Sequence, residues 1–527
     1  MTASGDRHPS PQLELTPAKN GLQTALMGGV YLHSRFDPAR EAQRYLEAHA
    51  SPRADTLIIF GPGLGYLSAA ARTSTTPRWS RVLCIFLQHQ TYLHAVDRGD
   101  MCWFPGCGVG LDDFLRTHLS PQDIPALEVL PWASAARALE QTASAHDFVP
   151  NLEAKLVSTI EELRRELVTA AYFSERRVRN VVQNVFTNGI YALKTHRPHN
   201  GPALVVASGP TLEGVRDPLR RAASGALVVA TSSAVPFLSD AGVSPDIIVH
   251  IDAGYYARLH LHRGRAHPQE SEVPVAMPFT AGKVAVPLVP VVFGTVEEDL
   301  LGLTGTHQDA VELPEDATVS ATACRVAQLL ATGPHYCLGF DFASQDLLDH
   351  ARPHAFDRYM ELRARRVEPG ETLRFVRIAD HDAVAGAWRQ STALAHYAAW
   401  FARNADTFQN FLRVAPSPVD IGIATAEAKQ MVAVCGQTPT PPSLIDHTED
   451  VTNKTRLRLR RRLGELRDEW ARYGSTPGFL SHPPLARLSE VADFAGTRRV
   501  RSGEGGVEDL RSSVSRLLHR LLSYAGS

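Results

Sequence analysis

The chain has 527 residues, of which 44% are hydrophobic and 21% charged, and its formal net charge is −2. This length allows roughly three domains with cores of their own, and the composition is that of an ordinary globular protein. A nearly neutral chain gives no argument for nucleic acid as the main partner. No run approaches the ~20 consecutive apolar residues of a transmembrane segment.

The six cysteines indicate a reducing compartment. Cys84, Cys324 and Cys337 lie in apolar runs, which is typical of buried free thiols. The first residues are polar and proline-rich and lack the apolar centre of a signal peptide. We therefore expect a cytoplasmic protein.

Residues 1–150 favour an α/β, Rossmann-like domain. The apolar run Thr56–Phe60 precedes the glycine-rich stretch Gly61–Tyr66, and a second run, Val82–Leu87, ends at Gln88. A working dinucleotide site usually has Asp or Glu there to bind the ribose hydroxyls. We therefore favour a scaffold role for this domain, and a second nucleotide site is the alternative.

Residues 151–199 are predicted to form a helical linker. Leu156, Ile160, Leu163 and Leu167 repeat at the spacing of one apolar helix face. The opposite positions carry mostly charged residues, so we expect this helix to pack domain one against domain two.

The pattern in residues 200–380 predicts a central domain that is built on a doubly wound and mostly parallel sheet. The apolar runs Ala203–Ala207, Ala226–Ala230 and Asp246–Ile251 alternate with helical segments, as in βαβ units. From residue 381 to 527 helix formers dominate, and we expect a helical C-terminal domain.

Small polar residues follow each of the three central runs, so they should meet at the carboxyl edge of the sheet, where open α/β sheets bind ligands. Free backbone amides at a Gly-Pro helix start favour phosphate. A βαβ turn without a ligand fits the same pattern. The predicted nucleotide-binding residues are Ser208, Gly209, Pro210, Thr211, Thr231, Ser232, Ser233 and Asp252.

Several segments resemble one known family. They are SGPTLE from Ser208, TSSAVPFLSDAGVSPDIIVHID from Thr231, YCLGFDFA from Tyr336, and Asp349-His350-Ala351-Arg352, where the family usually has Thr-His-Ala-Lys/Arg. YLHSRFDPAREA from Tyr31 and FGPGLGY from Phe60 extend the match upstream. Together they are similar to the Maf motility-associated proteins, whose central domain is also called 6-hydroxymethylpterin diphosphokinase MptE-like.

The resemblance implies a transferase that moves a sialic-acid-like sugar from a nucleotide donor, such as a CMP-linked one, to Ser or Thr of flagellin. His350 is then the motif-supported catalytic base, and Asp341, after a later strand, is a second candidate. Thr211 keeps the hydroxyl of the family's more common Ser. Asp252 would bind ribose hydroxyls or a divalent cation, although Ala253 replaces the usual Pro after it.

Two other functions fit the sequence. A pterin diphosphokinase would use the same turn for ATP, with Mg²⁺ held by carboxylates such as Asp252 and Asp341. A non-catalytic protein would use a degenerate transferase core and its helical tail to bind flagellar partners.

Overall fold

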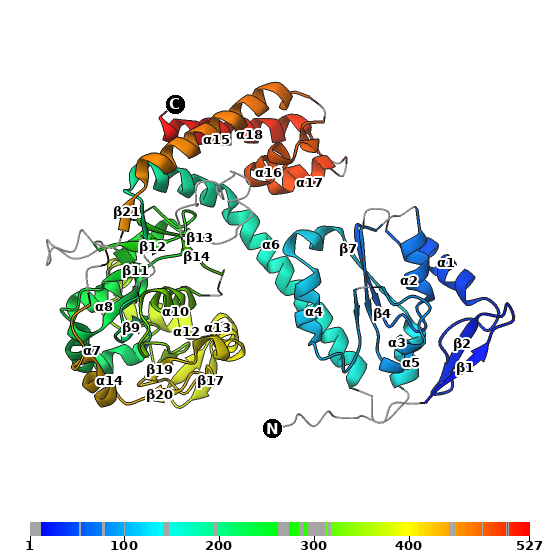
Figure 1. Ribbon diagram of the computed structural model, residues 1–527, viewed down its shortest axis with the longest axis horizontal. Coiled ribbons are helices and arrows are strands. Elements are labelled where there is room, and N and C mark those ends of the chain that lie inside the picture. The colour runs from blue at the N-terminus through cyan, green and yellow to red at the C-terminus, as the bar shows by residue number, and fades with distance from the viewer. Residues whose placement is uncertain are drawn as a thin grey trace. The chain divides into compact units, whose positions relative to one another are not determined.

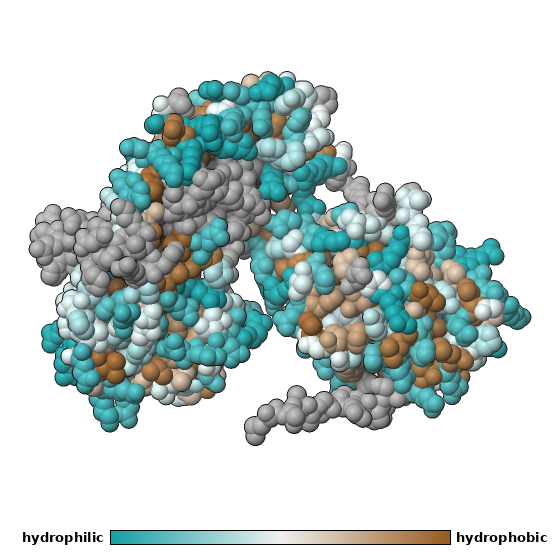
Figure 2. Space-filling view, in the orientation of Figure 1, coloured by the Kyte–Doolittle hydropathy of each residue, from teal (hydrophilic) through white to brown (hydrophobic). Residues whose placement is uncertain are grey.

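The computed structural model describes most of the chain, in two compact units, Met1–Tyr172 and Phe173–Ser527. Hydrophilic and hydrophobic residues are mixed over the face shown in Figure 2. No helix within the described ranges is long and apolar enough to cross a bilayer. Those ranges are 12–51, 54–75, 79–99, 101–140, 147–193, 198–261, 273–283, 288–292, 311–314, 316, 318–441, 444, 448–476, 478–501, 503 and 505–526.

The first unit has the α/β fold predicted for residues 1–150. Its described residues form a four-stranded parallel sheet in the order β6-β5-β4-β7 and a separate antiparallel sheet, β1-β2-β3. Every residue of β4 is buried, as expected of a central parallel strand. The strands are β1 Leu13–Pro17, β2 Gln23–Met27, β3 Val30–Tyr31, β4 Thr56–Phe60, β5 Arg81–Ile85, β6 Cys102–Trp103 and β7 Leu127–Pro131, and the helices are α1 Pro38–His49, α2 Tyr66–Thr73, α3 His89–Leu93, α4 Leu111–His118 and α5 Ala133–Glu140.

The glycine-rich loop after β4 is packed against a side chain of its own unit. The backbone N–H of Leu64 donates to Nε2 of His33 over 2.7 Å. A Cβ on Gly63 would lie 2.5 Å from the same nitrogen, so this position needs glycine. Burial lowers the pKa of His33 to about 3, which keeps the ring neutral and able to accept. These contacts favour the predicted scaffold role.

The described residues of the second unit form a nine-stranded sheet in the order β14-β13-β12-β11-β10-β9-β15-β19-β20, and every pairing is parallel. Its central strands are short runs of buried valine, leucine and isoleucine. The strands are β9 Ala203–Val206, β10 Leu227–Thr231, β11 Ile247–Val249, β12 Val275–Met277, β13 Leu288–Val292, β14 Val311–Glu312, β15 His335–Leu338, β19 Phe411–Val414 and β20 Thr425–Ala426.

Helices cover both faces of this sheet (Figure 1). On one face Leu204 and Val206 of β9 belong to a core with α7, α8 and α14; on the other, Ala203 and Val205 belong to a core with α10 and α13. This confirms the predicted doubly wound α/β fold. These helices are α7 Arg216–Ala222, α8 Val235–Asp240, α10 Val319–Leu330, α13 Thr392–Arg403 and α14 Ala428–Cys435, with α11 Asp357–Arg363 and α12 Gly370–Ile378 beyond β15.

The sheet does not end at the expected boundary near residue 380. β19 pairs with β15 and β20 with β19, so residues 411–414 and 425–426 belong to the central sheet. A small antiparallel sheet, β16-β18-β17, also lies across this boundary. The strands are β16 Ser344–Gln345, β17 Asp382–Ala385 and β18 Trp388–Gln390. The predicted all-helical character holds from Thr452 onward.

The predicted linker, residues 151–199, contains helix α6, Phe148–Thr187, followed by β8, Tyr191–Leu193. Valines near the end of α6, such as Val181 and Val185, share a core with leucines of the C-terminal helices, such as Leu463 and Leu517. Strand β21, Thr448–Asp450, pairs with β8. The helices are α15 Thr452–Tyr473, α16 Pro483–Ala492, α17 Phe494–Arg501 and α18 Val507–Ala525.

Candidate functional site

The chain reverses its strand order between β9 and β15. β10 lies on one side of β9 and β15 on the other, so the loops after β9 and β15 leave the sheet in the region where doubly wound folds bind ligands. Ser208 and Gly209 follow β9, and Asp341 follows β15. A short 3₁₀ helix, η2, Pro210–Val215, begins directly after Gly209.

Asp341 holds the turn after β9. Its Oδ2 accepts the backbone N–H of Thr211 over 2.8 Å, and its Oδ1 accepts the Thr211 hydroxyl over 2.7 Å. Gly209 donates its N–H to the Gly339 carbonyl over 2.9 Å, and Leu212 donates to the Gly209 carbonyl over 3.1 Å. The prediction of free amides in this turn is therefore wrong, because all three N–H groups have partners inside the protein.

Gly209 is needed for a close contact between two parts of the chain. A Cβ at this position would lie 2.4 Å from Oδ2 of Asp341 and 2.5 Å from the carbonyl oxygen of Gly339. Gly339 itself has φ +69°, a conformation that favours glycine. The sequence suggested that Gly209 allows a ligand to approach the backbone. In the structure, Asp341 and Gly339 occupy the space beside Gly209 instead.

The second predicted base, Asp341, is only 2% exposed. Burial raises the pKa of its carboxyl, while the two bonds from Thr211 and the charge of Arg413 oppose that rise. Arg413 is also buried and donates to the carbonyl oxygens of Phe340 and Val419. With both oxygens bonded to Thr211, Asp341 is a structural residue of the turn, which corrects its predicted role as base or metal ligand.

Three of the predicted hydroxyls do meet at the carboxyl edge. The Ser208 hydroxyl donates to Oγ of Ser233 over 2.9 Å, and Thr231 Oγ1 lies 3.1 Å from the same oxygen. Ser233 belongs to a short 3₁₀ helix, η4, Ser232–Ala234, directly after β10. Ser233 is partly exposed, so this hydroxyl row is open to a ligand on one side.

Asp252 follows β11 and is exposed, as a ligand-binding carboxylate must be. Its Oδ1 accepts the N–H of Gly254 over 2.6 Å, and its carbonyl oxygen accepts the N–H of Gly282 over 2.7 Å. These bonds tie the loop after β11 to the loop after β12 and fix the direction of the Asp252 side chain.

Two buried asparagines of α6 donate hydrogen bonds to the loops after β11 and β12. Neither asparagine was predicted as a site residue. The Asn180 side-chain amide donates to the carbonyls of Ala253 and Thr280 over 3.1 and 3.0 Å. Asn184 donates to the carbonyls of Phe279 and Ala281, both over 2.9 Å. The two asparagines lie one helical turn apart on α6, so they present their amides on one face. The sequence does contain a sign of this role, because the two asparagines interrupt an otherwise apolar stripe of the helix.

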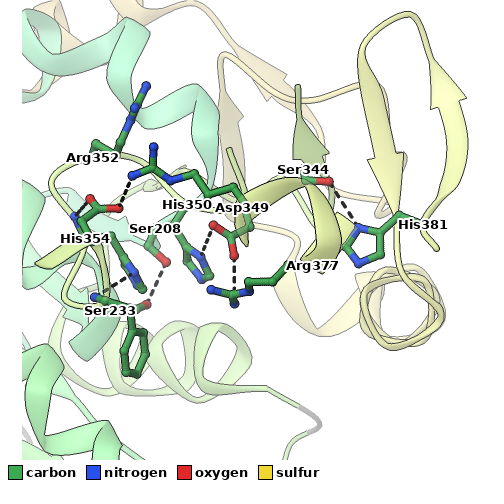
Figure 3. Close-up of polar contacts among 12 residues, drawn as sticks. Ser208, Ser233, Ser344, Asp349, His350, Arg352, His354, Arg377 and His381 are labelled. Carbon is green, nitrogen blue, oxygen red and sulfur yellow. Dashed lines mark hydrogen bonds and ion pairs between the residues drawn. The ribbon is translucent and has the colours of Figure 1, made fainter. Parts of the chain in front are cut away.

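The loop after β16 carries His350 and is bonded to the backbone of Ser208. The N–H of Ala351 donates to the carbonyl of Ser208 over 2.8 Å. Nδ1 of His350 lies 3.4 Å from Oδ1 of Asp349, and Oδ2 of Asp349 lies 2.9 Å from Arg377 of α12. Figure 3 shows Asp349 between His350 and Arg377. Although burial opposes it, the contacts with His350 and Arg377 hold the pKa of Asp349 below its usual range.

A carboxylate facing one imidazole nitrogen favours the tautomer with the proton on that nitrogen. The 3.4 Å separation is an ion-pair distance that is long for a hydrogen bond. In this arrangement Nε2 of His350 is left as the proton acceptor, which is the state that a general base requires. The predicted base therefore has an orienting carboxylate, and that carboxylate has an arginine behind it.

Three more histidines surround this loop and were not predicted as site residues. The His354 ring stacks on the His350 ring with 4.2 Å between centroids, and the His260 ring lies 5.1 Å from that of His354. His260 comes from the 3₁₀ helix η5, Tyr255–Leu261. His250 directly follows β11, and its Nδ1 lies 3.1 Å from Oγ of Ser232. Two of these four histidines follow β11 and two follow β16, and neither pair by itself gives a sequence signal of such a cluster.

The described residues contain no group of three His, Cys, Asp or Glu side chains arranged to hold a metal ion. A pair formed by Asp252 and Asp341 also fits a cation poorly, because Thr211 occupies both oxygens of Asp341. The site as built is therefore one of hydroxyls, imidazoles and one exposed carboxylate.

Comparison with known proteins covers part of the site, since the matched region includes Ser208, Ser233 and Asp252 but ends before His350. Residues 175–346 match the family 6-hydroxymethylpterin diphosphokinase MptE-like. A protein of Treponema pallidum (strain Nichols), described as "Uncharacterized protein", is 27% identical over 307 residues, which are 55% of this chain and 60% of that protein. The chain thus spans less than two thirds of that relative.

One solved structure has the same fold over nearly the whole chain. It is the Maf glycosyltransferase of Magnetospirillum magneticum AMB-1, with a TM-score of 0.54, 12% identity, and coverage of 98% of this chain and 92% of that one. The predicted resemblance is confirmed: the chain carries an MptE-like domain at residues 175–346 and has the fold of the Maf glycosyltransferase structure.

Proposed function

We propose that this protein is a glycosyltransferase that moves a sialic-acid-like sugar from a CMP-linked donor to a Ser or Thr hydroxyl of flagellin. The observation that carries the proposal is that His350, oriented by Asp349, lies on a loop whose next residue, Ala351, donates its N–H to the carbonyl of Ser208. The Ser208 hydroxyl in turn donates to that of Ser233. The shared fold with a Maf glycosyltransferase and the MptE-like domain add support.

In this reaction the acceptor hydroxyl gives its proton to Nε2 of His350 while its oxygen attacks the anomeric carbon of the sugar. The bond between that carbon and the phosphate oxygen breaks, and the electron pair leaves with CMP. Asp349 stabilises the imidazolium that forms, and Arg377 holds Asp349 in place.

Negative charge grows on the departing phosphate and needs hydrogen-bond donors. The turn after β9 does not supply them, because its amides and the Thr211 hydroxyl are bonded inside the protein. Ser208 donates its hydroxyl proton to Ser233, and Thr231 is fully buried. The partly exposed hydroxyl of Ser233 is therefore the one of the three that is suited to donate to the phosphate. Asp252, exposed after β11, is suited to accept from the ribose hydroxyls.

A pterin diphosphokinase is the second candidate, and the description of the matching family favours it. That reaction needs Mg²⁺ to bridge phosphate oxygens. Asp341, one of the two carboxylates suggested for Mg²⁺, has both oxygens bonded to Thr211, which favours the transferase. A non-catalytic binding protein would also bind ligands through this edge, without turnover.

Titration of the full-length protein with CMP, a CMP-linked sugar and ATP, each with and without Mg²⁺, separates these functions. We expect selective binding of CMP and of the CMP-linked sugar. Asp252→Ala should lose this binding and keep the unfolding temperature, whereas Asp382→Ala, an exposed carboxylate on β17, should change neither. Mg²⁺-dependent ATP binding without CMP binding would support the diphosphokinase instead.

A further inference from the structure

Three histidines at this edge each have a buried ring nitrogen without a hydrogen-bond partner among the described residues. Nε2 of His250, Nε2 of His354 and Nδ1 of His260 lack a hydrogen-bond partner within the described residues. His250 is fully buried and His354 is 9% exposed. Leaving a buried polar atom unpaired costs about 1–3 kcal/mol, so three such atoms around one loop need an explanation.

The contacts of these rings indicate which nitrogens can donate. Nδ1 of His354 accepts a long, 3.5 Å bond from the backbone N–H of Phe356, which places the proton of the neutral ring on Nε2. Nδ1 of His250 is occupied by Oγ of Ser232. The remaining nitrogens of His250 and His354, with Nδ1 of His260, have no partner among the described residues. When the Ser232 hydroxyl donates to Nδ1 of His250, its Nε2 carries the proton, as Nε2 of His354 does, and both suit a ligand that brings acceptor oxygens.

The charges around the rings make them responsive to an anion. Burial, with a smaller contribution from neighbouring histidines, lowers the pKa of His250 and of His260 to about 4 and that of His354 to about 2. All three rings are therefore neutral at pH 7. An anion within hydrogen-bond distance favours the charged form of an imidazole and draws in a proton.

The fixed charges facing the rings come from every neighbouring segment. Asp252 follows β11, and Asp349 and Arg352 lie on the loop that carries His350 and His354. Asp357 of α11 accepts the N–H of His354 and pairs with Arg374 over 3.1 Å, and Arg377 pairs with Asp349. Since Asp349 and Asp357 each face an arginine, Asp252 is the remaining carboxylate that disfavours an anion here.

We propose that His250, His260 and His354 form an anion subsite, which receives the phosphate of the nucleotide or the carboxylate of the sugar and takes up a proton when that group binds. This inference rests on the proposed function for the identity of the ligand. It assigns to the three histidines a task separate from that of His350, namely holding the anionic group of the donor.

Calorimetric titrations of the full-length protein at pH 7, in two buffers with different ionisation enthalpies, measure the protons taken up. The ligands are cytidine, CMP, N-acetylneuraminic acid and inorganic phosphate. Proton uptake with CMP and phosphate but not with cytidine identifies the phosphate as the bound group. Uptake with the acidic sugar alone identifies the carboxylate. Failure of all three anions to bind, or binding without proton uptake, overturns the proposal.

Two variants test the residues. His260→Asn, at a partly exposed position, and His354→Asn, at a buried one, should each weaken binding of the anion about tenfold to a hundredfold and reduce proton uptake. His396→Gln, an exposed histidine on α13, should change neither. Unchanged affinity and uptake in both asparagine variants would overturn the subsite. CMP binding with proton uptake in a protein that transfers no sugar would leave the subsite standing and remove the proposed function.

Discussion

Asp341 accepts two hydrogen bonds from Thr211, one from the backbone N–H and one from the hydroxyl, so both of its carboxylate oxygens are used. Asp341 follows β15 and Thr211 lies three residues beyond Ser208, so the pair links the loops of two neighbouring strands where the strand order reverses. The turn that seemed built for phosphate is therefore closed by the protein's own carboxylate. Our proposed ligand contacts therefore lie at the neighbouring hydroxyls and histidines.

Replacing Asp341 with alanine should destabilise the protein by about 1–3 kcal/mol, because a buried N–H and hydroxyl of Thr211 lose their acceptor. Chemical denaturation of the full chain should show the transition that reports on the second unit at lower denaturant concentration. Asp252→Ala, at an exposed position, serves as the control and should shift that transition by less than about 0.5 kcal/mol. Equal stability of the Asp341→Ala variant and the wild type would refute the structural role of this carboxylate.

Asp349→Asn should lower kcat about tenfold to a hundredfold and leave KM nearly unchanged, because the amide orients His350 but cannot stabilise its imidazolium. Steady-state kinetics with a CMP-linked sugar donor give both constants. Asp349→Glu should recover part of the rate, since it restores the charge. A change confined to KM would instead place Asp349 in substrate binding.

Asn184→Ala should cost about 1–3 kcal/mol, because the carbonyls of Phe279 and Ala281 lose their donor in a buried place. The loop next to Asp252 should also exchange its amide hydrogens faster, which hydrogen exchange measured by mass spectrometry detects. Gln183→Ala, the neighbouring position on α6, is the matched control. Unchanged amide hydrogen exchange in residues 279–282 would argue that the Asn184 side chain does not fix this loop.

The first unit should lose stability as the pH falls from about 6.5 toward 3. The pKa of His33 is lowered to about 3 in the folded protein by burial, whereas an unfolded histidine titrates near 6.5. The unfolded state therefore binds the proton first, and folding loses about 4 to 5 kcal/mol across this window. Unfolding of wild type and His33→Gln at pH 7 and pH 4 measures the effect. A loss of equal size in the variant would show that other groups cause it.

The sequence was informative where a strand and its following residues form one continuous pattern. The apolar runs before Ser208, Ser233 and Asp252 predicted that these residues follow strands of one sheet. The motif around His350 singled out the residue that we propose as the base. Contacts between distant segments were invisible: Asp341 is 130 residues from Thr211, and nothing in either segment announces the bond. The histidines of the proposed anion subsite were missed for the same reason, because His250 and His260 follow β11 whereas His354 follows β16.

The predicted end of the central domain near residue 380 was wrong for a related reason. Strands β19 and β20 contain four and two residues, too few to show alternation or a long apolar run among helix formers. Partners elsewhere in the sheet stabilise them, since β19 pairs with all four residues of β15. Such short strands exist because the sheet is already present, so local sequence carries little sign of them.

The most direct test of the central claim is the release of CMP from a CMP-linked sialic-acid-like donor in the presence of an acceptor with free Ser and Thr hydroxyls. We expect acceptor-dependent CMP release with sugar on the acceptor, reduced at least a hundredfold in His350→Gln while CMP still binds. Wild-type protein that binds CMP but transfers no sugar, or equal transfer by His350→Gln, would contradict the account.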